Sequence, residues 1–190
     1  MIELIEIKTD SALYNYAEQL MTTSFPQEER RDTEQQRWYT DYKTLFHYCI
    51  IMDNAIPLGL LTYWDFQTFI YIEHFAIDNK LRNLGYGKQA LKAFTEQIKL
   101  PIVLEVEEPT NETSKRRISF YEHQGFTLHE LPYLQPPYRK DDTWFPLKLM
   151  TYGEIDMHKM YEEVKEKIYK EVYNQYKRSC FCNSFLHISY

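Results

Sequence analysis

Two glycines separated by one residue, Gly85 and Gly87, stand directly before an amphipathic segment of this chain. That segment repeats apolar residues at helical spacing, at Ala90, Leu91, Phe94 and Ile98. Glycine lets the backbone come close to a ligand, and the first N–H groups of a helix are free to bind an anion. Arg82 adds a positive charge beside them. The pattern favours a pyrophosphate-binding turn between a strand and a helix.

Apolar runs on both sides of this turn predict a sheet. Three precede it and one follows the helix, at residues 47–52, 57–65, 69–77 and 102–106. The turn signal Asp53-Asn54 joins the first two, so the three early runs predict an antiparallel meander. The run after Pro101 is connected through a helix, which allows it to lie parallel to its predecessor. Antiparallel strands before a turn with two glycines argue against a Rossmann dinucleotide site, which needs a third glycine and a preceding βαβ unit.

The remaining segments complete an α+β fold of three layers, with a mixed, mainly antiparallel central sheet and helices on both faces. We expect a strand at 1–7, helices at 11–23, 33–42 and 113–124, extended structure at 126–130, a proline-marked loop at 131–139 and a last strand at 147–150. Asp10 or Ser11 would cap the first of these helices, and Thr113 or Ser114 the third.

A polar helix with an apolar stripe is expected at residues 154–177. The chain therefore divides into a domain at 1–150 and a C-terminal helical extension at 151–190. The stripe must be buried either on the domain or at an oligomer interface, such as that of a homodimer. Packing on the domain is favoured because the stripe lacks the heptads of a coiled coil.

Charge and composition exclude several kinds of partner. The formal net charge is −6, and lysines and arginines are dispersed, so nucleic acid is not expected to bind. No run approaches the roughly 18 apolar residues of a membrane helix, and no cationic leader begins the chain, so we expect a cytoplasmic protein with no membrane partner. Cys180, Cys182 and His187 lack a fourth ligand nearby, so no metal site is expected.

Two motifs resemble those of a known superfamily. Arg82, Gly85 and Gly87 match the pattern R/Q-x-x-G-x-G/A, and residues 118–126 are similar to an F-Y-x-x-x-G-F stretch that ends a late helix. Both are features of the GNAT superfamily of acetyl-coenzyme A-dependent N-acetyltransferases. With the order of elements, the resemblance covers most of residues 1–150. It implies acetyl-CoA as cosubstrate.

The resemblance also implies roles for individual residues. The pyrophosphate would be wrapped by Arg82, Asn83, Leu84, Gly85, Tyr86, Gly87 and Lys88. Backbone groups of Phe75 and Ile77 would hold the pantetheine arm and the thioester. Tyr121 would lie near the sulfur, where a phenol is suited to protonating a departing thiolate. Many members carry an Asn after the late strand, and here Asn111 or Ser114 would take its place.

An amine must lose a proton before it attacks a thioester. Strict alternation along 69–77 puts Glu73 on the same face as Phe75 and Ile77, so Glu73 is the first candidate for the general base. His74 is the second, because a bulge in the strand would exchange the two. Glu105 and Glu107 are further carboxylate candidates.

These features predict an N-acetyltransferase that moves an acetyl group from acetyl-CoA to a primary amine of a small molecule or peptide. Transfer would be direct, in a ternary complex, because no Ser/His/Asp arrangement or reactive cysteine context offers a covalent intermediate. The acceptor would contact segments 25–42 and 131–139, since loops vary while the coenzyme frame stays fixed. The alternative is a non-catalytic acyl-CoA-binding module that regulates or recruits a partner.

Overall fold

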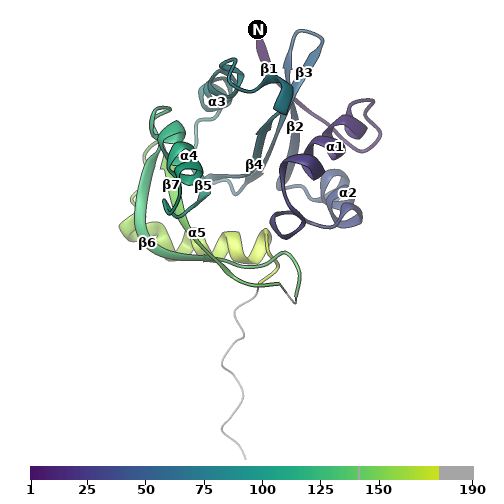
Figure 1. Ribbon diagram of the computed structural model, residues 1–190. Coiled ribbons are helices and arrows are strands. Elements are labelled where there is room, and N and C mark those ends of the chain that lie inside the picture. Colours follow the sequence, from purple (N-terminus) through teal and green to yellow (C-terminus); the bar gives the residue numbers. More distant parts are fainter. Residues whose placement is uncertain (141, 176–190) are drawn as a thin grey trace, which may run out of the picture.

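A computed structural model describes residues 1–140 and 142–175, in which seven strands form one sheet with helices around it (Figure 1). The strands are β1 (Ile2–Glu6), β2 (Phe46–Asp53), β3 (Ile56–Asp65), β4 (Ile70–Ile77), β5 (Ile102–Glu107), β6 (Thr127–Gln135) and β7 (Phe145–Tyr152). The helices are α1 (Tyr14–Ser24), α2 (Thr33–Tyr42), α3 (Tyr86–Gln97), α4 (Glu112–Glu122) and α5 (Met157–Glu171), with 3₁₀ turns η1 (Gln27–Glu29) and η2 (Asn79–Leu81). The cysteine pair at 180 and 182, considered above for a metal, lies outside the described residues.

The sheet follows the order β1-β2-β3-β4-β5-β7-β6. Every neighbouring pair is antiparallel except β4 and β5, which are parallel and connected through α3. The expected mixed, mainly antiparallel sheet is therefore confirmed. The β4–β5 ladder covers only Ile70–Ile72 against Ile102–Leu104, so the two strands are unpaired with each other toward their C-terminal ends.

A β-bulge interrupts β4 where that ladder ends. Thr62 of β3 pairs with His74 while the next residue, Tyr63, pairs with Ile72, which leaves Glu73 without an opposite residue. The extra residue breaks the alternation of side chains. Glu73 and His74 consequently both contact the side of the sheet on which α1 lies, where Trp64 and Phe25 are their neighbours.

Beyond the bulge, Phe75 and Ile77 pack on the opposite side of the sheet, with α3 and α4. The prediction that Glu73 shares a face with Phe75 and Ile77 is therefore wrong. A strict period of two describes a strand only as far as its ladder is regular.

Two apolar clusters cover the two faces of the sheet. One contains buried residues of α1, α2 and α5, and the other contains those of α3 and α4. In α5, Val164 and Ile168 are both 0% exposed and belong to the first cluster, so the helix contributes to the core of the described chain. None of the helices described is long and apolar enough to cross a membrane.

Several expected boundaries differ from the structure, and three have a clear local cause. α1 begins at Tyr14 rather than Ser11, because the Ser11 hydroxyl accepts a hydrogen bond from the Leu13 N–H and forms a turn ahead of the helix. The N-cap of α4 is Asn111, whose side chain accepts a hydrogen bond from the Ser114 N–H at 2.9 Å. β6 continues through Pro132 to Gln135, because it is an edge strand whose pairing with β7 is irregular between His129 and Tyr133.

The burial of α5 predicts that it unfolds together with the domain. Ile168→Ala should lower the free energy of unfolding by about 3 kcal/mol, because it removes buried methylene groups and leaves a cavity. The matched control is Lys167→Ala at the exposed neighbouring position, which should change stability by less than about 0.5 kcal/mol. Urea denaturation measures both. Equal stability of the two variants would mean that α5 is not part of the cooperative core.

Candidate functional site

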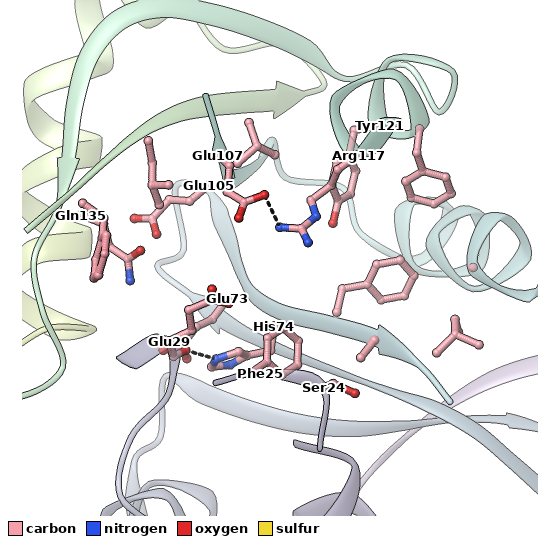
Figure 2. Close-up of a pocket in the computed structure, with 18 of the residues that line it drawn as sticks. Ser24, Phe25, Glu29, Glu73, His74, Glu105, Glu107, Arg117, Tyr121 and Gln135 are labelled. Carbon is pink, nitrogen blue, oxygen red and sulfur yellow. Dashed lines mark hydrogen bonds and ion pairs between the residues drawn. The ribbon is translucent and has the colours of Figure 1, made fainter. Parts of the chain in front are cut away.

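A cavity of about 930 Å³ lies where β4 and β5 are no longer paired. Its walls come from both strands, from the loop before α3, from α4, from the segment between α1 and α2, from β6 and β7, and from Tyr173. Figure 2 shows the side chains of these elements pointing toward a common space. The cavity contains residues of both apolar faces of the sheet, so it passes from one face to the other.

The loop before α3 supplies the cationic end of the cavity. Gly85 is the N-cap of α3 and has a φ of 85°, a left-handed conformation that favours glycine. The Gln89 N–H bonds to the Gly85 carbonyl at 3.2 Å, so the N–H groups of the three residues before Gln89 have no acceptor inside the helix. Among the residues expected to wrap a pyrophosphate, the cavity is lined by Arg82, Asn83, Gly85, Gly87 and Lys88, and not by Leu84 or Tyr86.

Free backbone groups of β4 border this end of the cavity. Beyond Ile72 the strand has no partner on the β5 side, and Phe75 and Ile77 line the cavity there. The Ile77 carbonyl accepts a hydrogen bond from the Arg82 Nε at 3.2 Å, which holds the arginine beside the strand. An extended polar arm and an anionic group are thus offered adjacent binding surfaces.

Tyr121 of α4 lines the same cavity (Figure 2). Its ring packs edge-on against Phe120 and Phe126, and it is 8% exposed. No hydrogen-bond partner for its hydroxyl is found in the described part of the chain. Burial raises the pKa of Tyr121 to about 12, so the hydroxyl keeps its proton at neutral pH and is available as a donor.

The two residues considered as substitutes for the family's Asn have different positions. Asn111 lines the cavity, whereas Ser114 is buried and does not. Both are engaged in the capping box of α4, since the Asn111 N–H also donates to the Ser114 hydroxyl. Ser114 therefore shapes the start of the helix rather than the cavity surface.

Glu73, the first base candidate from sequence, is enclosed in an ion pair. Its side chain is 0% exposed and lies 2.7 Å from the Arg31 guanidinium. It also accepts hydrogen bonds from Tyr138 at 2.6 Å and from the Trp64 indole at 2.9 Å. Burial alone would raise the pKa of Glu73, but the Arg31 charge and the hydrogen bond from Tyr138 lower it below its usual value. Such a carboxylate is a weak base, and its side chain has no exposed surface.

Arg31 was not identified from sequence, because it lies in a polar stretch that is typical of exposed loops. It is 2% exposed and donates to the Val172 carbonyl at 3.0 Å. Four aromatic rings surround its guanidinium at 4.5 to 5.6 Å, those of Tyr39, Phe46, Trp64 and Tyr138. Burial by itself would lower the pKa of Arg31, but the Glu73 carboxylate outweighs it and raises the pKa.

His74, the second base candidate, has both ring nitrogens occupied. Its Nε2 lies 2.9 Å from the Glu29 carbonyl, which can only accept, so Nε2 carries the proton. Its Nδ1 lies 3.0 Å from the Thr62 hydroxyl, which also accepts the His74 backbone N–H. Burial lowers the pKa of His74, so the ring is neutral at physiological pH. The residue is a satisfied core histidine.

Glu105 of β5 faces the same cavity from the opposite wall (Figure 2). It has no cationic partner in the described chain, and its carboxylate accepts hydrogen bonds from Tyr133 and, at 2.8 Å, from Tyr173. Burial raises the pKa of Glu105 to about 7, although the tyrosine hydroxyls oppose that rise. A carboxylate with this pKa can take up a proton near neutral pH, which is what a general base requires.

Residues 11–126 match the model of the Acetyltransferase (GNAT) family. The chain is 47% identical to a solved structure of a GNAT-family acetyltransferase from Bacteroides thetaiotaomicron. The match covers 92% of this chain and 99% of that one, with a TM-score of 0.90. A search of curated proteins finds no match.

Two more distant structures share the fold and carry ligands. A GNAT-family acetyltransferase from Elizabethkingia anophelis with acetyl-CoA bound is 15% identical, with 80% of this chain and 98% of that chain covered and a TM-score of 0.54. Arabidopsis thaliana Naa50, in complex with a bisubstrate analogue that joins CoA to a peptide, is 18% identical, with 80% and 99% covered and a TM-score of 0.58.

The environment of Glu105 predicts a pH-dependent cost to stability. The pKa of the Glu105 carboxyl is about 7 in the folded chain and lower in the unfolded chain. The folded chain therefore loses stability as pH rises between those two values. Glu105→Gln removes this cost, so its stability relative to wild type should increase from pH 5 to pH 8 by up to about 3 kcal/mol. Thermal or urea unfolding at both pH values measures the difference. A difference that does not change with pH would contradict the raised pKa.

Proposed function

Since the chain belongs to the GNAT family of acetyltransferases, we propose that it transfers the acetyl group of acetyl-CoA directly to a primary amine of a small molecule or peptide. One observation carries this proposal. A single cavity extends from the glycine loop before α3, along the free backbone edge of β4, to Glu105. The Glu105 carboxylate has no cationic partner in the described residues. This arrangement brings a site suited to a pyrophosphate, a channel suited to a thioester arm and a base into one continuous space.

The cationic end would hold the coenzyme. The free N–H groups at the start of α3, together with Arg82 and Lys88, favour a pyrophosphate, since both the helix dipole and the side chains attract negative charge. The pantetheine arm would then lie along Phe75 and Ile77. Relatives of the same fold bind acetyl-CoA or a CoA conjugate, which supports this orientation by analogy.

Glu105 replaces Glu73 as our candidate for the general base. As the carboxylate, Glu105 accepts a proton from the ammonium form of the acceptor. The amine nitrogen then bonds to the thioester carbon, and unpaired N–H groups of β4 stabilise the negative charge that develops on the carbonyl oxygen. The C–S bond breaks as the hydroxyl of Tyr121 gives its proton to the departing sulfur. The nitrogen then releases its second proton, which returns through solvent to the Tyr121 phenolate and restores the phenol. The products are the N-acetylated amine and free coenzyme A.

The coenzyme site is tested by calorimetric titration with acetyl-CoA. Gly85→Glu should abolish measurable binding, because it puts a side chain and a negative charge where the pyrophosphate would lie. Gly153→Glu is the matched control, since Gly153 has nearly the same φ, 83° against 85°, and does not line the cavity. The control should bind acetyl-CoA like wild type. Binding by Gly85→Glu, or no binding by wild type, would remove the support for this site.

The base assignment is tested by the pH dependence of kcat/KM. In wild type, kcat/KM should fall as pH drops below about 7, because Glu105 becomes protonated. Glu105→Gln should lower kcat by roughly 10²- to 10⁴-fold and remove this acidic limb. Glu73→Gln should lower stability but retain the limb near pH 7, because it breaks a buried ion pair and leaves Glu105 in place. Loss of the limb in Glu73→Gln, with its retention in Glu105→Gln, would reverse the assignment.

A further inference from the structure

The lining of the cavity outside the glycine loop is strongly acidic. It includes six carboxylates: Glu28, Glu29, Glu73, Glu105, Glu107 and Glu108. Two of them are paired, Glu73 with Arg31 and Glu107 with Arg117 at 3.1 Å. The other four have no cationic partner in the described ranges. Negative charge outside the glycine loop is therefore in excess, and it is available to a positively charged occupant.

These carboxylates lie at two depths. Glu105 is at the inner level, beside the hydroxyls of Tyr133 and Tyr173. Glu107 is two residues further along β5, which corresponds to a separation of about 7 Å along the strand. Glu29 approaches the same level from η1, close enough to interact with the charges of Glu107 and Arg117. Burial raises the pKa of Glu29, the Arg117 charge opposes this rise, and the Glu107 charge adds to it. An inner carboxylate and an outer group of carboxylates are thus present on the path of an entering ligand.

A separate observation at the inner level points to a ligand. Gln135 of β6 is 9% exposed and lines the cavity, and its side chain has no hydrogen-bond partner within residues 1–140 and 142–175. Figure 2 shows its amide pointing toward the side chains of Glu73 and Glu105. A buried amide usually finds a partner in the folded chain, because an unmade hydrogen bond is costly. The side-chain carbonyl of Gln135 is a suitable acceptor for an ammonium or amine N–H at this position.

Apolar side chains lie among these polar groups. Phe25, Phe145 and Leu147 line the cavity; Phe145 is opposite Gln135 in the β6–β7 ladder, and Leu147 is opposite Glu107 in the β5–β7 ladder. They offer surfaces to a methylene chain, while the nearby carboxylates suit charged groups. The cavity therefore offers carboxylates at two levels together with apolar wall. A flexible aliphatic chain with an amine at each end would match this arrangement.

We propose that the acceptor is an aliphatic diamine or polyamine. One amine lies at Glu105 and Gln135 and receives the acetyl group. The second, as an ammonium, is held at the outer level by Glu29 with Glu28. This inference rests on the proposed acetyltransferase function. A monoamine would leave the outer carboxylates unpaired, so the second ammonium is what the cavity selects.

The test compares acceptors of matched length with acetyl-CoA as donor. We expect wild type to use putrescine and spermidine with a kcat/KM at least about tenfold higher than that of butylamine, since one further ion pair of moderate strength corresponds to about that factor. The preference should decrease at high salt, which screens charges at the cavity mouth. Equal kcat/KM values for putrescine and butylamine would overturn the inference while leaving the acetyltransferase function intact. If none of the amines releases free thiol, the proposed function itself fails.

A variant locates the second ammonium. Glu29→Gln should lower the ratio of the kcat/KM for putrescine to that for butylamine by several fold, and the double variant Glu28→Gln/Glu29→Gln by more. Glu34→Gln is the matched control, because Glu34 is exposed on α2 and does not line the cavity. It should leave the ratio at its wild-type value. A purely structural effect of Glu29 would lower both kcat/KM values and keep the ratio, and that result would contradict the assignment.

Discussion

The ion pair between Arg31 and Glu73 joins the parts of the chain that form the candidate site. Arg31 comes from the segment between α1 and α2, Glu73 from the bulge of β4, and the Val172 carbonyl at the end of α5 accepts from the same guanidinium. A charge buried this deeply requires a partner with good geometry, because an unpaired one would cost several kcal/mol. The pair therefore holds the first helices, the interrupted edge of β4 and the C-terminal helix in one arrangement around the cavity.

The same pair explains why two neighbouring glutamates differ in chemistry. Glu73 has the Arg31 cation and two hydrogen bonds, and its pKa is lowered, so it stays ionised. Glu105 has only tyrosine hydroxyls beside it, and burial raises its pKa to about 7. Carboxylates whose environments move their pKa values apart are suited to different tasks. In the proposed mechanism Glu73, through its pair with Arg31, holds the cavity wall in place, and Glu105 accepts the proton of the acceptor amine.

The sequence was informative where the signal is local. Gly85, Gly87 and Tyr121 stand in short motifs, and the apolar runs of the meander are each read within a few residues, so the fold and the glycine loop before α3 could be predicted. The acceptor end depends on distant partners: Tyr173 lies 68 residues from Glu105. The choice between Glu73 and Glu105 depends on a bulge and a buried arginine, and neither follows from hydrophobic periodicity, which carries no information on tertiary pairing.

The most direct test of this account is a crystal structure with a bisubstrate conjugate, in which the sulfur of coenzyme A is linked through an acetyl bridge to an amine. We expect the pyrophosphate at the N–H groups that begin α3, the bridge beside Phe75 and Tyr121, and the amine nitrogen within hydrogen-bond distance of the Glu105 carboxylate. An amine nitrogen bound at His74 or Glu73, or a pyrophosphate away from Gly85, would contradict it.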